Sequence, residues 1–415
     1  MSLLRRRVMG GESTPDPVNG MTGAYIKFTM IGSINPPDRI EIKFNKKGTC
    51  NPHIEYCVRT NAPSNNSQWT VVKQSEFGNL IVSNQAGNSS SCIYVRGYNP
   101  SGLSTSQSNY FYFVLYGISG GYIKVEGNIM YLVDCTQTLT VVPCAYCFYS
   151  LFSNVGGGAS DPLRDASGVI VCTTSTTAKN YCYASMFKND NGLSSAPSLP
   201  LTTLQAGIYQ SMFENCTLLK TPPSLPATTL REYCYQAMFK GCTKLTSAPT
   251  LPGTQAQLNC YNSMFANCTS LTTAPSLPAV ISSAAGSNAN YCYESMFSGC
   301  KALTTAPPTL SSTNLSKATY CYRYMFKGCV KLTTAPVISA ITLSTGCFTQ
   351  MFYGCVLLNY IKAMFTTAPS TTYMDSWVSS VASSGTFVKN SAATWTNTFG
   401  TSAIPSGWTV QTASS

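Results

Sequence analysis

The sequence predicts a multidomain chain, in which an N-terminal all-β sandwich is followed by an α/β leucine-rich-repeat solenoid with a C-terminal cap. Three observations predict it: alternating apolar runs between about residues 25 and 133, a unit of about 26 residues that recurs after them, and loss of that unit near residue 360. The predicted parts are 1–20, a flexible basic arm; 21–137, the β-sandwich; 138–360, the solenoid; and 361–415, the cap.

The N-terminal arm carries the only tight run of positive charge, Arg5, Arg6 and Arg7. A net charge of +11 raises the possibility of nucleic-acid binding, but the other lysines and arginines are scattered through the repeats. We therefore expect no specific nucleic-acid contact. No apolar run of signal-peptide length follows the arginines, and no stretch reaches the ~20 apolar residues of a membrane span.

The sandwich is predicted from short runs such as RIEIKFN, SCIYVRGY and YIKVEGN, which recur at intervals of roughly ten residues. Their apolar residues alternate with polar ones, and Gly, Pro and Asn lie between the runs. This alternation is typical of strands with one face in a core and one face in solvent.

The repeat is aligned on the dipeptide Met-Phe, and one clean unit reads TTLREYCYQAMFKGCTKLTSAPTLP, residues 228–252. An incomplete copy lies at Leu151-Phe152. One such unit cannot bury its own apolar face, but stacked copies can. The Met-Phe pairs begin at Met186, Met212, Met238, Met264, Met296, Met325 and Met351.

Within the unit, Leu230, Cys234 and Met238 fall at i, i+4 and i+8, which predicts one apolar stripe along a helix of about three turns. Thr229 and Glu232 have the spacing of a capping box at its start. Only Gly or Asn follows Met-Phe-x, and these residues tolerate the left-handed conformation that ends helices. The Leu-x-x-Ala-Pro that comes next is interpreted as a short strand ended by proline.

Nineteen cysteines require a choice between disulfides, metal ligands and packing. We expect reduced, buried thiols. Twelve of the cysteines recur at two positions of the repeat and so form two columns, and disulfides within the second column remain an alternative. Seven cysteines lie elsewhere, and Cys144-Ala-Tyr-Cys147 has the spacing of a zinc or redox motif. With no second such pair and one histidine, His53, packing is the preferred interpretation. The columns are Cys182, Cys234, Cys260, Cys292, Cys321 and Cys347, and Cys216, Cys242, Cys268, Cys300, Cys329 and Cys355.

Paired tyrosines are the candidate binding surface, because they bracket the first-column cysteine. In each pair we expect one ring to pack between repeats and the other to reach solvent, with a structural role favoured over binding of sugar or protein. No catalytic set, phosphate loop, cofactor site or metal site is recognised, so we expect a non-enzymatic protein. The tyrosines are Tyr181, Tyr183, Tyr233, Tyr235, Tyr291, Tyr293, Tyr320 and Tyr322.

The repeat resembles the BspA-like leucine-rich repeats of gut Bacteroides and of the crAss-like or related phages that infect them. The resemblance covers roughly residues 138–360 and implies binding or adhesion. Without a predicted secretory signal, we expect a phage virion protein, structural or part of a fibre, assembled in the host cytoplasm. Its expected partners are other virion proteins, further copies of itself, and host surface glycan or protein. Arg5, Arg6 and Arg7 are the candidate virion anchor. The alternative is a bacterial cell-surface adhesin.

Overall fold

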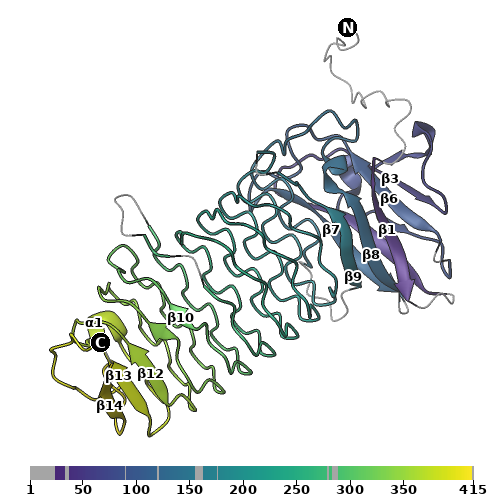
Figure 1. Cartoon of the computed structure of the whole chain (residues 1–415). Helices are drawn as coiled ribbons and strands as arrows, with labels where there is room; N and C mark the ends of the chain where they lie inside the picture. Colours follow the sequence, from purple (N-terminus) through teal and green to yellow (C-terminus); the bar gives the residue numbers. More distant parts are fainter. Residues whose placement is uncertain are drawn as a thin grey trace.

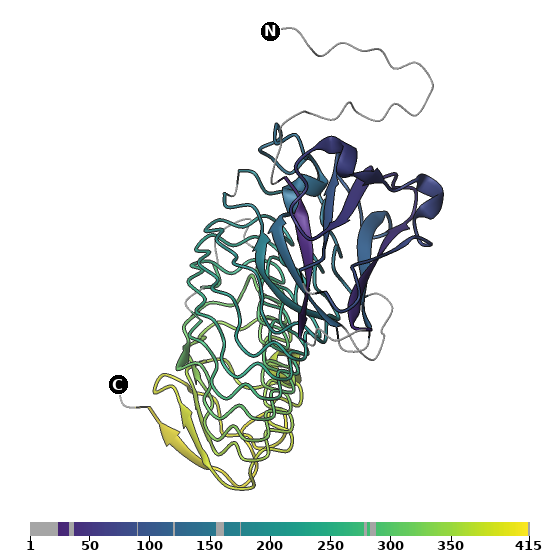
Figure 2. The same ribbon diagram turned by 90° about the vertical axis from the view of Figure 1, so that its right-hand side faces the viewer.

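The computed structural model describes residues 24–32, 37–88, 90–118, 121–154, 162–174, 176–277, 280–282 and 288–413. The molecule is elongated, with a β-sandwich at one end, a stack of coils along its length and a parallel sheet at the other end (Figure 1). Turned by 90°, the coils are seen to stack directly on one another (Figure 2). The described part of the chain thus forms one rod rather than separate globules.

The sandwich consists of two sheets. The larger has the strand order β4-β3-β6-β1-β8-β9 and the smaller the order β5-β2-β7. All pairs within them are antiparallel except β8 with β9. The strands are β1 Ile26–Gly32, β2 Arg39–Lys47, β3 Ile54–Arg59, β4 Thr70–Val71, β5 Ile81–Ser83, β6 Cys92–Gly97, β7 Tyr110–Ile118, β8 Gly121–Asn128 and β9 Leu163–Ile170, with short 3-10 helices η1 Asn66–Gln68, η2 Gln74–Glu76 and η3 Ile129–Leu132.

Strict alternation of apolar and polar side chains favours strands in these segments. In β1, Ile26, Phe28 and Met30 are buried while the residues between them are half-exposed. In β2, Ile40, Ile42 and Phe44 are likewise buried, and the residues between them are half-exposed. Because side chains alternate across a strand, each sheet presents one apolar face, and the two faces enclose a common core.

The sandwich and the coils share that core. β9 lies in the range predicted for the solenoid, yet it pairs in parallel with β8 and completes the larger sheet. Phe113 of β7 stacks on Phe152, with ring centroids 5.6 Å apart, and Phe152 stacks on Phe187 of the next coil at 5.4 Å. The Leu151-Phe152 copy therefore takes the first place in the stack, and the sandwich covers that end.

The predicted repeat helix is wrong, and the α/β leucine-rich-repeat fold class with it. Among the described residues the only α-helix is α1, Thr371–Met374. Residues 233–242 instead form a ribbon of consecutive turns with positive φ at every fourth residue, +59° at Tyr233, +52° at Ala237 and +76° at Gly241. The stack is a turn solenoid, capped by β-sheet at both ends.

The backbone hydrogen bonds of the ribbon run alternately along and between coils. The amides of Tyr235 and Phe239 donate to the carbonyls of Cys260 and Met264 in the next coil, at 3.0 and 2.9 Å. The amides of Gln236 and Met238 donate three residues back within their own coil. Every amide from residue 233 to 242 thus has a partner without an i to i−4 bond.

The apolar spacing explains both the prediction and its failure. A four-residue spacing lies close to the 3.6 residues of a helical turn, but a helix rotates by about 40° more than one turn over four residues. The ribbon repeats every four residues without that drift. Cys234 and Met238, and likewise Tyr235 and Phe239, therefore point into the core, and all four are buried.

Gly and Asn after Met-Phe-x have the predicted left-handed conformation, which is confirmed. They are the third left-handed position of each ribbon rather than the end of a helix. The two earlier positions, mostly Tyr or Ser, also have positive φ, of about +50° to +60°. The confirmed positions are Asn189, Asn215, Gly241, Asn267, Gly299, Gly328 and Gly354.

Two columns of stacked rings run inside the solenoid. The phenylalanine of each Met-Phe pair stacks on that of the next coil at 5.4 to 5.7 Å, from Phe152 to Phe352. A second column of rings runs from Phe148 through the buried tyrosines to Phe348 at 5.5 to 6.2 Å. Burial of each ring stabilises the stack by roughly 1.5–3 kcal/mol.

The predicted Leu-x-x-Ala-Pro strand is mostly reduced to single parallel bridges, such as Thr273 with Thr305. Toward the C-terminus these grow into a parallel sheet of order β10-β11-β12-β13-β14. The cap continues the stack, since Phe352 donates its amide to the carbonyl of Trp377 at 2.8 Å. The strands are β10 Thr309–Leu310, β11 Val337–Ile338, β12 Tyr360–Ala363, β13 Thr386–Lys389 and β14 Thr409–Thr412.

The turn ribbon predicts an unusual response to Ala237→Gly. We expect the free energy of unfolding to stay unchanged or to rise by up to about 1 kcal/mol. Glycine avoids the roughly 1–2 kcal/mol cost of placing a residue with a side chain in the left-handed conformation. This gain outweighs the roughly 0.4–1 kcal/mol entropic cost that comes from the greater freedom of glycine in the unfolded chain. In a helix interior the same change would cost about 1 kcal/mol. Chemical denaturation distinguishes the two signs.

Ala184→Gly is the matched control for this experiment. Ala184 is buried in a ribbon like Ala237, but its φ is not positive. We expect this variant to lose roughly 1 kcal/mol. Equal losses in both variants would contradict the ribbon.

Candidate functional site

The tyrosine pairs divide between the core and the surface of the solenoid. The second member of each pair is buried, so Tyr183, Tyr235, Tyr293 and Tyr322 are not available to a ligand. This corrects their place in the candidate binding surface. The physical reason is the ribbon, in which the residue after the first-column cysteine faces inward. Tyr181, Tyr233, Tyr291 and Tyr320 are half-exposed at the first left-handed position.

Half-exposed tyrosine rings pack against residues of the neighbouring coils. Tyr181 stacks on Tyr146 at 4.8 Å and covers Gly207, where an added Cβ would lie 1.9 Å from the ring. Tyr320 stacks on Tyr291 at 5.4 Å and covers Gly346. Since neighbouring coils occupy ring faces of Tyr181, Tyr291 and Tyr320, these three tyrosines chiefly brace the stack.

A cluster of cations and rings lies on the same side, around Arg323. Its guanidinium carbon is 4.5 Å from the ring centroid of Tyr320 and 5.1 Å from that of Tyr324, and it pairs with Glu294. Lys327 lies between the rings of Tyr324 and Tyr353, at 4.9 and 5.0 Å. The solenoid thus carries a local surface of aromatic and basic groups, in contrast to its mostly uncharged coils.

A groove opens between the proline-bearing segments of two neighbouring coils, 246–252 and 272–276. Its volume is about 460 Å³, within the usual range for ligand pockets. The lining consists of Thr, Ser, Ala, Pro and Leu side chains, without a titratable group. Such a groove offers apolar contact and hydroxyl hydrogen bonds, but its lining has no acid or base that could activate the serine and threonine hydroxyls.

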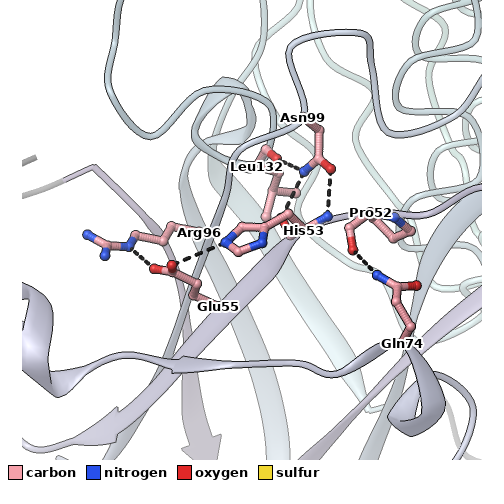
Figure 3. Close-up of polar contacts among 7 residues, drawn as sticks. All are labelled: Pro52, His53, Glu55, Gln74, Arg96, Asn99 and Leu132. Atoms are coloured by element: carbon pink, nitrogen blue, oxygen red, sulfur yellow. Dashed lines mark hydrogen bonds and ion pairs between the residues drawn. The ribbon is translucent and has the colours of Figure 1, made fainter. Parts of the chain in front are cut away.

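His53 belongs to a polar cluster on the larger sheet of the sandwich (Figure 3). Its Nε2 lies 3.2 Å from Oε1 of Glu55, and Nε of Arg96 donates to Oε2 of the same carboxylate at 2.6 Å. The Arg96 guanidinium also lies over the Trp69 ring, 4.3 Å from its centroid. Burial by itself raises the pKa of Glu55, but the hydrogen bonds from His53 and Arg96 outweigh it and hold that pKa below its ordinary value.

Asn99 ties this cluster to η3, the 3-10 helix that follows β8. Its side-chain oxygen accepts from the amide of His53 at 2.7 Å, and its amide group donates to the carbonyls of His53 and Leu132 (Figure 3). Nearby, Gln74 donates to the carbonyl of Pro52 at 3.0 Å. The sequence did not reveal these contacts, because the partners lie in segments far apart in the chain, as Glu55 on β3 and Arg96 on β6 do. We interpret the cluster as a brace for the sandwich.

The Glu55 brace makes a testable prediction about pH. We expect Glu55→Gln to lower the free energy of unfolding by about 1.5–3 kcal/mol near neutral pH, since Arg96 keeps only a neutral acceptor. A carboxyl group whose pKa is lower in the folded than in the unfolded state stabilises the fold at pH values above its unfolded-state pKa. That stabilisation is lost as the pH falls through its folded-state pKa. The difference between wild type and variant, measured by denaturation, should therefore shrink toward about pH 3.

Glu232→Gln is the control for that measurement, because Glu232 is exposed. We expect it to change the free energy of unfolding by less than about 0.5 kcal/mol at either pH. A Glu55→Gln deficit that stays constant from neutral to acidic pH would contradict the ionic role of Glu55.

The column cysteines are all buried. In the second column each sulfur donates to the carbonyl of the Phe one coil back, as Cys242 does to Phe213 at 3.1 Å. Burial raises the pKa of Cys260 in the first column and of Cys300 in the second to about 12. Across the described ranges no group of three His, Cys, Asp or Glu is placed to hold a metal ion.

The remaining predicted site, the arginine run Arg5, Arg6 and Arg7, lies outside the described residues, as does the whole arm 1–20. In the part of the chain that the structure covers, no helix is long and apolar enough to cross a membrane. Comparison of the chain with protein-family models, curated proteins and solved structures gave no match in any of the three.

Proposed function

We propose that this chain is a non-enzymatic structural or fibre protein of a phage virion. In this proposal the sandwich and the N-terminal arm attach to the particle, and the solenoid projects to contact host surface glycan or protein, or neighbouring subunits. The protein assembles in the host cytoplasm, with other virion proteins and further copies of itself as partners.

One observation carries the proposal: a single apolar core runs from Ile26 in the sandwich to Trp408 in the C-terminal cap. Successive coils are joined by backbone hydrogen bonds and by two columns of stacked rings. A rod built this way resists bending at every coil, which suits an element that holds a contact surface away from its attachment point.

The surface chemistry supports recognition rather than catalysis. Charged residues are 10% of the chain, and the groove between coils has no titratable lining. The cluster around Arg323 and the half-exposed tyrosine edges supply the kinds of groups that are enriched in binding sites. The resemblance of the repeat to BspA-like repeats of Bacteroides and their phages is a further reason to favour the virion.

Mass spectrometry of purified particles tests the proposal. We expect the protein in the particles at a fixed copy number, and a variant lacking residues 1–20 to be absent from them while still folding. Detection only in the cell envelope would reject the virion and favour the alternative, a bacterial cell-surface adhesin. Release of reducing sugar from host capsule by the purified protein would reject a purely non-enzymatic role.

A further inference from the structure

Cys144 and Cys147 lie where the sandwich meets the first coil. Cys147 is fully buried and continues the first cysteine column, since Phe148 donates its amide to the carbonyl of Cys182 in the next coil. Cys144 belongs to neither column and is half-exposed. It is therefore the member of the pair that a solute reaches first.

The local fold brings the two sulfurs together. Residues 145–147 form a turn with φ of +59° at Tyr146, and such a turn holds its first and fourth Cα atoms within about 7 Å, as a disulfide requires. Gly102 leaves the space, because a Cβ there would lie 2.2 Å from Sγ of Cys144 and 3.6 Å from Sγ of Cys147. A Cβ at that one position would thus lie against both sulfurs, so the two thiols line the same space.

The two thiols differ in chemistry. The hydrogen bond from Cys147 lowers the pKa of Cys144, whereas burial raises the pKa of Cys147 well above its ordinary value. A half-exposed thiol of lowered pKa beside a buried thiol of raised pKa is the arrangement of an attacking and a resolving cysteine. The column thiols lack this pairing of an accessible and a buried sulfur.

We propose that Cys144 and Cys147 are a redox-active pair that closes into a disulfide on meeting a small-molecule disulfide. The Cys144 thiolate attacks one sulfur of the oxidant and expels the other as a thiolate, which takes up a proton. Cys147 then gives up its proton, attacks Sγ of Cys144 and expels the second half of the oxidant as a thiol. Two cysteine thiols are oxidised, and one disulfide is reduced to two thiols.

The disulfide would act on the joint between sandwich and solenoid. In the reduced state Sγ of Cys144 donates to the carbonyl of Ser104 at 3.1 Å, in the connection between β6 and β7. Oxidation removes that donor and so one of the bonds that hold this connection against the first coil. The inference does not depend on the proposed function.

Thiol mapping of the full-length protein tests the proposal. The protein is equilibrated in mixtures of reduced and oxidised glutathione, quenched with acid, unfolded, alkylated and digested with trypsin. The fragment 125–164 contains Cys135, Cys144 and Cys147. As the proportion of oxidant increases, we expect Cys144 and Cys147 to lose their alkyl groups together, while Cys135 stays alkylated.

Two variants complete the test. Cys144→Ser keeps a donor for the Ser104 carbonyl and should leave Cys147 alkylated at every ratio, whereas Cys135→Ser should leave closure of the pair unchanged. Full alkylation of Cys144 and Cys147 in the most oxidising mixture would overturn the proposal. So would a bridge between Cys147 and Cys182, or a glutathione mixed disulfide on Cys144 as the stable product in these mixtures.

Discussion

Phe265→Ala is expected to lower the free energy of unfolding by about 3–5 kcal/mol. Phe265 is fully buried in the middle of the phenylalanine column, where it stacks on Phe239 and Phe297 at 5.7 Å on both sides. Truncation removes two ring contacts and leaves a cavity that neighbouring coils cannot close, because backbone hydrogen bonds on both sides fix their spacing. Urea denaturation measures the loss.

Phe399→Ala is the control, since it is the same substitution at a ring that is 53% exposed. We expect a change within about 0.5 kcal/mol. A loss at Phe265 no larger than that at Phe399 would mean that the phenylalanine column is not a stabilising core. The proposed rod would then lose its physical basis.

Gly207→Ala is the second change with a large expected effect. Gly207 has φ +57°, and an added Cβ would lie 1.9 Å from the Tyr181 ring of the preceding coil. The variant carries the roughly 1–2 kcal/mol cost of a left-handed residue and must also displace that ring, so we expect a total loss of about 2–4 kcal/mol. Thermal and chemical denaturation measure it.

Gly328→Ala separates the two contributions. Gly328 has φ +73°, but nothing lies within 4 Å of its added Cβ, so only the backbone cost applies. We expect it to lose about 1–2 kcal/mol. If both variants lose the same amount, the Tyr181 ring does not brace the stack, and the ring becomes available as a contact surface.

Some features of this protein follow from the sequence because they depend on local spacing. Leu230, Cys234 and Met238 were placed on one apolar face, and all three are buried. The positions limited to Gly and Asn were assigned left-handed backbone, and most of them have it. The alternation of apolar and polar residues in 26–32 predicted a half-buried strand, and this segment is the half-buried strand β1.

The candidate site was less predictable, because its contacts join segments far apart in the chain. Glu55 and Arg96 lie on different strands, and Cys144 lies beside a glycine in the connection between β6 and β7. The paired tyrosines show the same limit. Their spacing indicates that one ring of each pair packs between coils, but only the turn geometry decides that the buried ring is the one after the cysteine.

By itself the sequence determined the repeat length, the register of the copies and the set of side chains that face inward, because each is a matter of residue type at a fixed interval. Only the tertiary structure decided between helix and turn ribbon. An amide such as that of Tyr235 has two competing acceptors, a carbonyl four residues back or one in the next coil, and it bonds the latter. That choice depends on a neighbouring coil whose backbone is in place to accept.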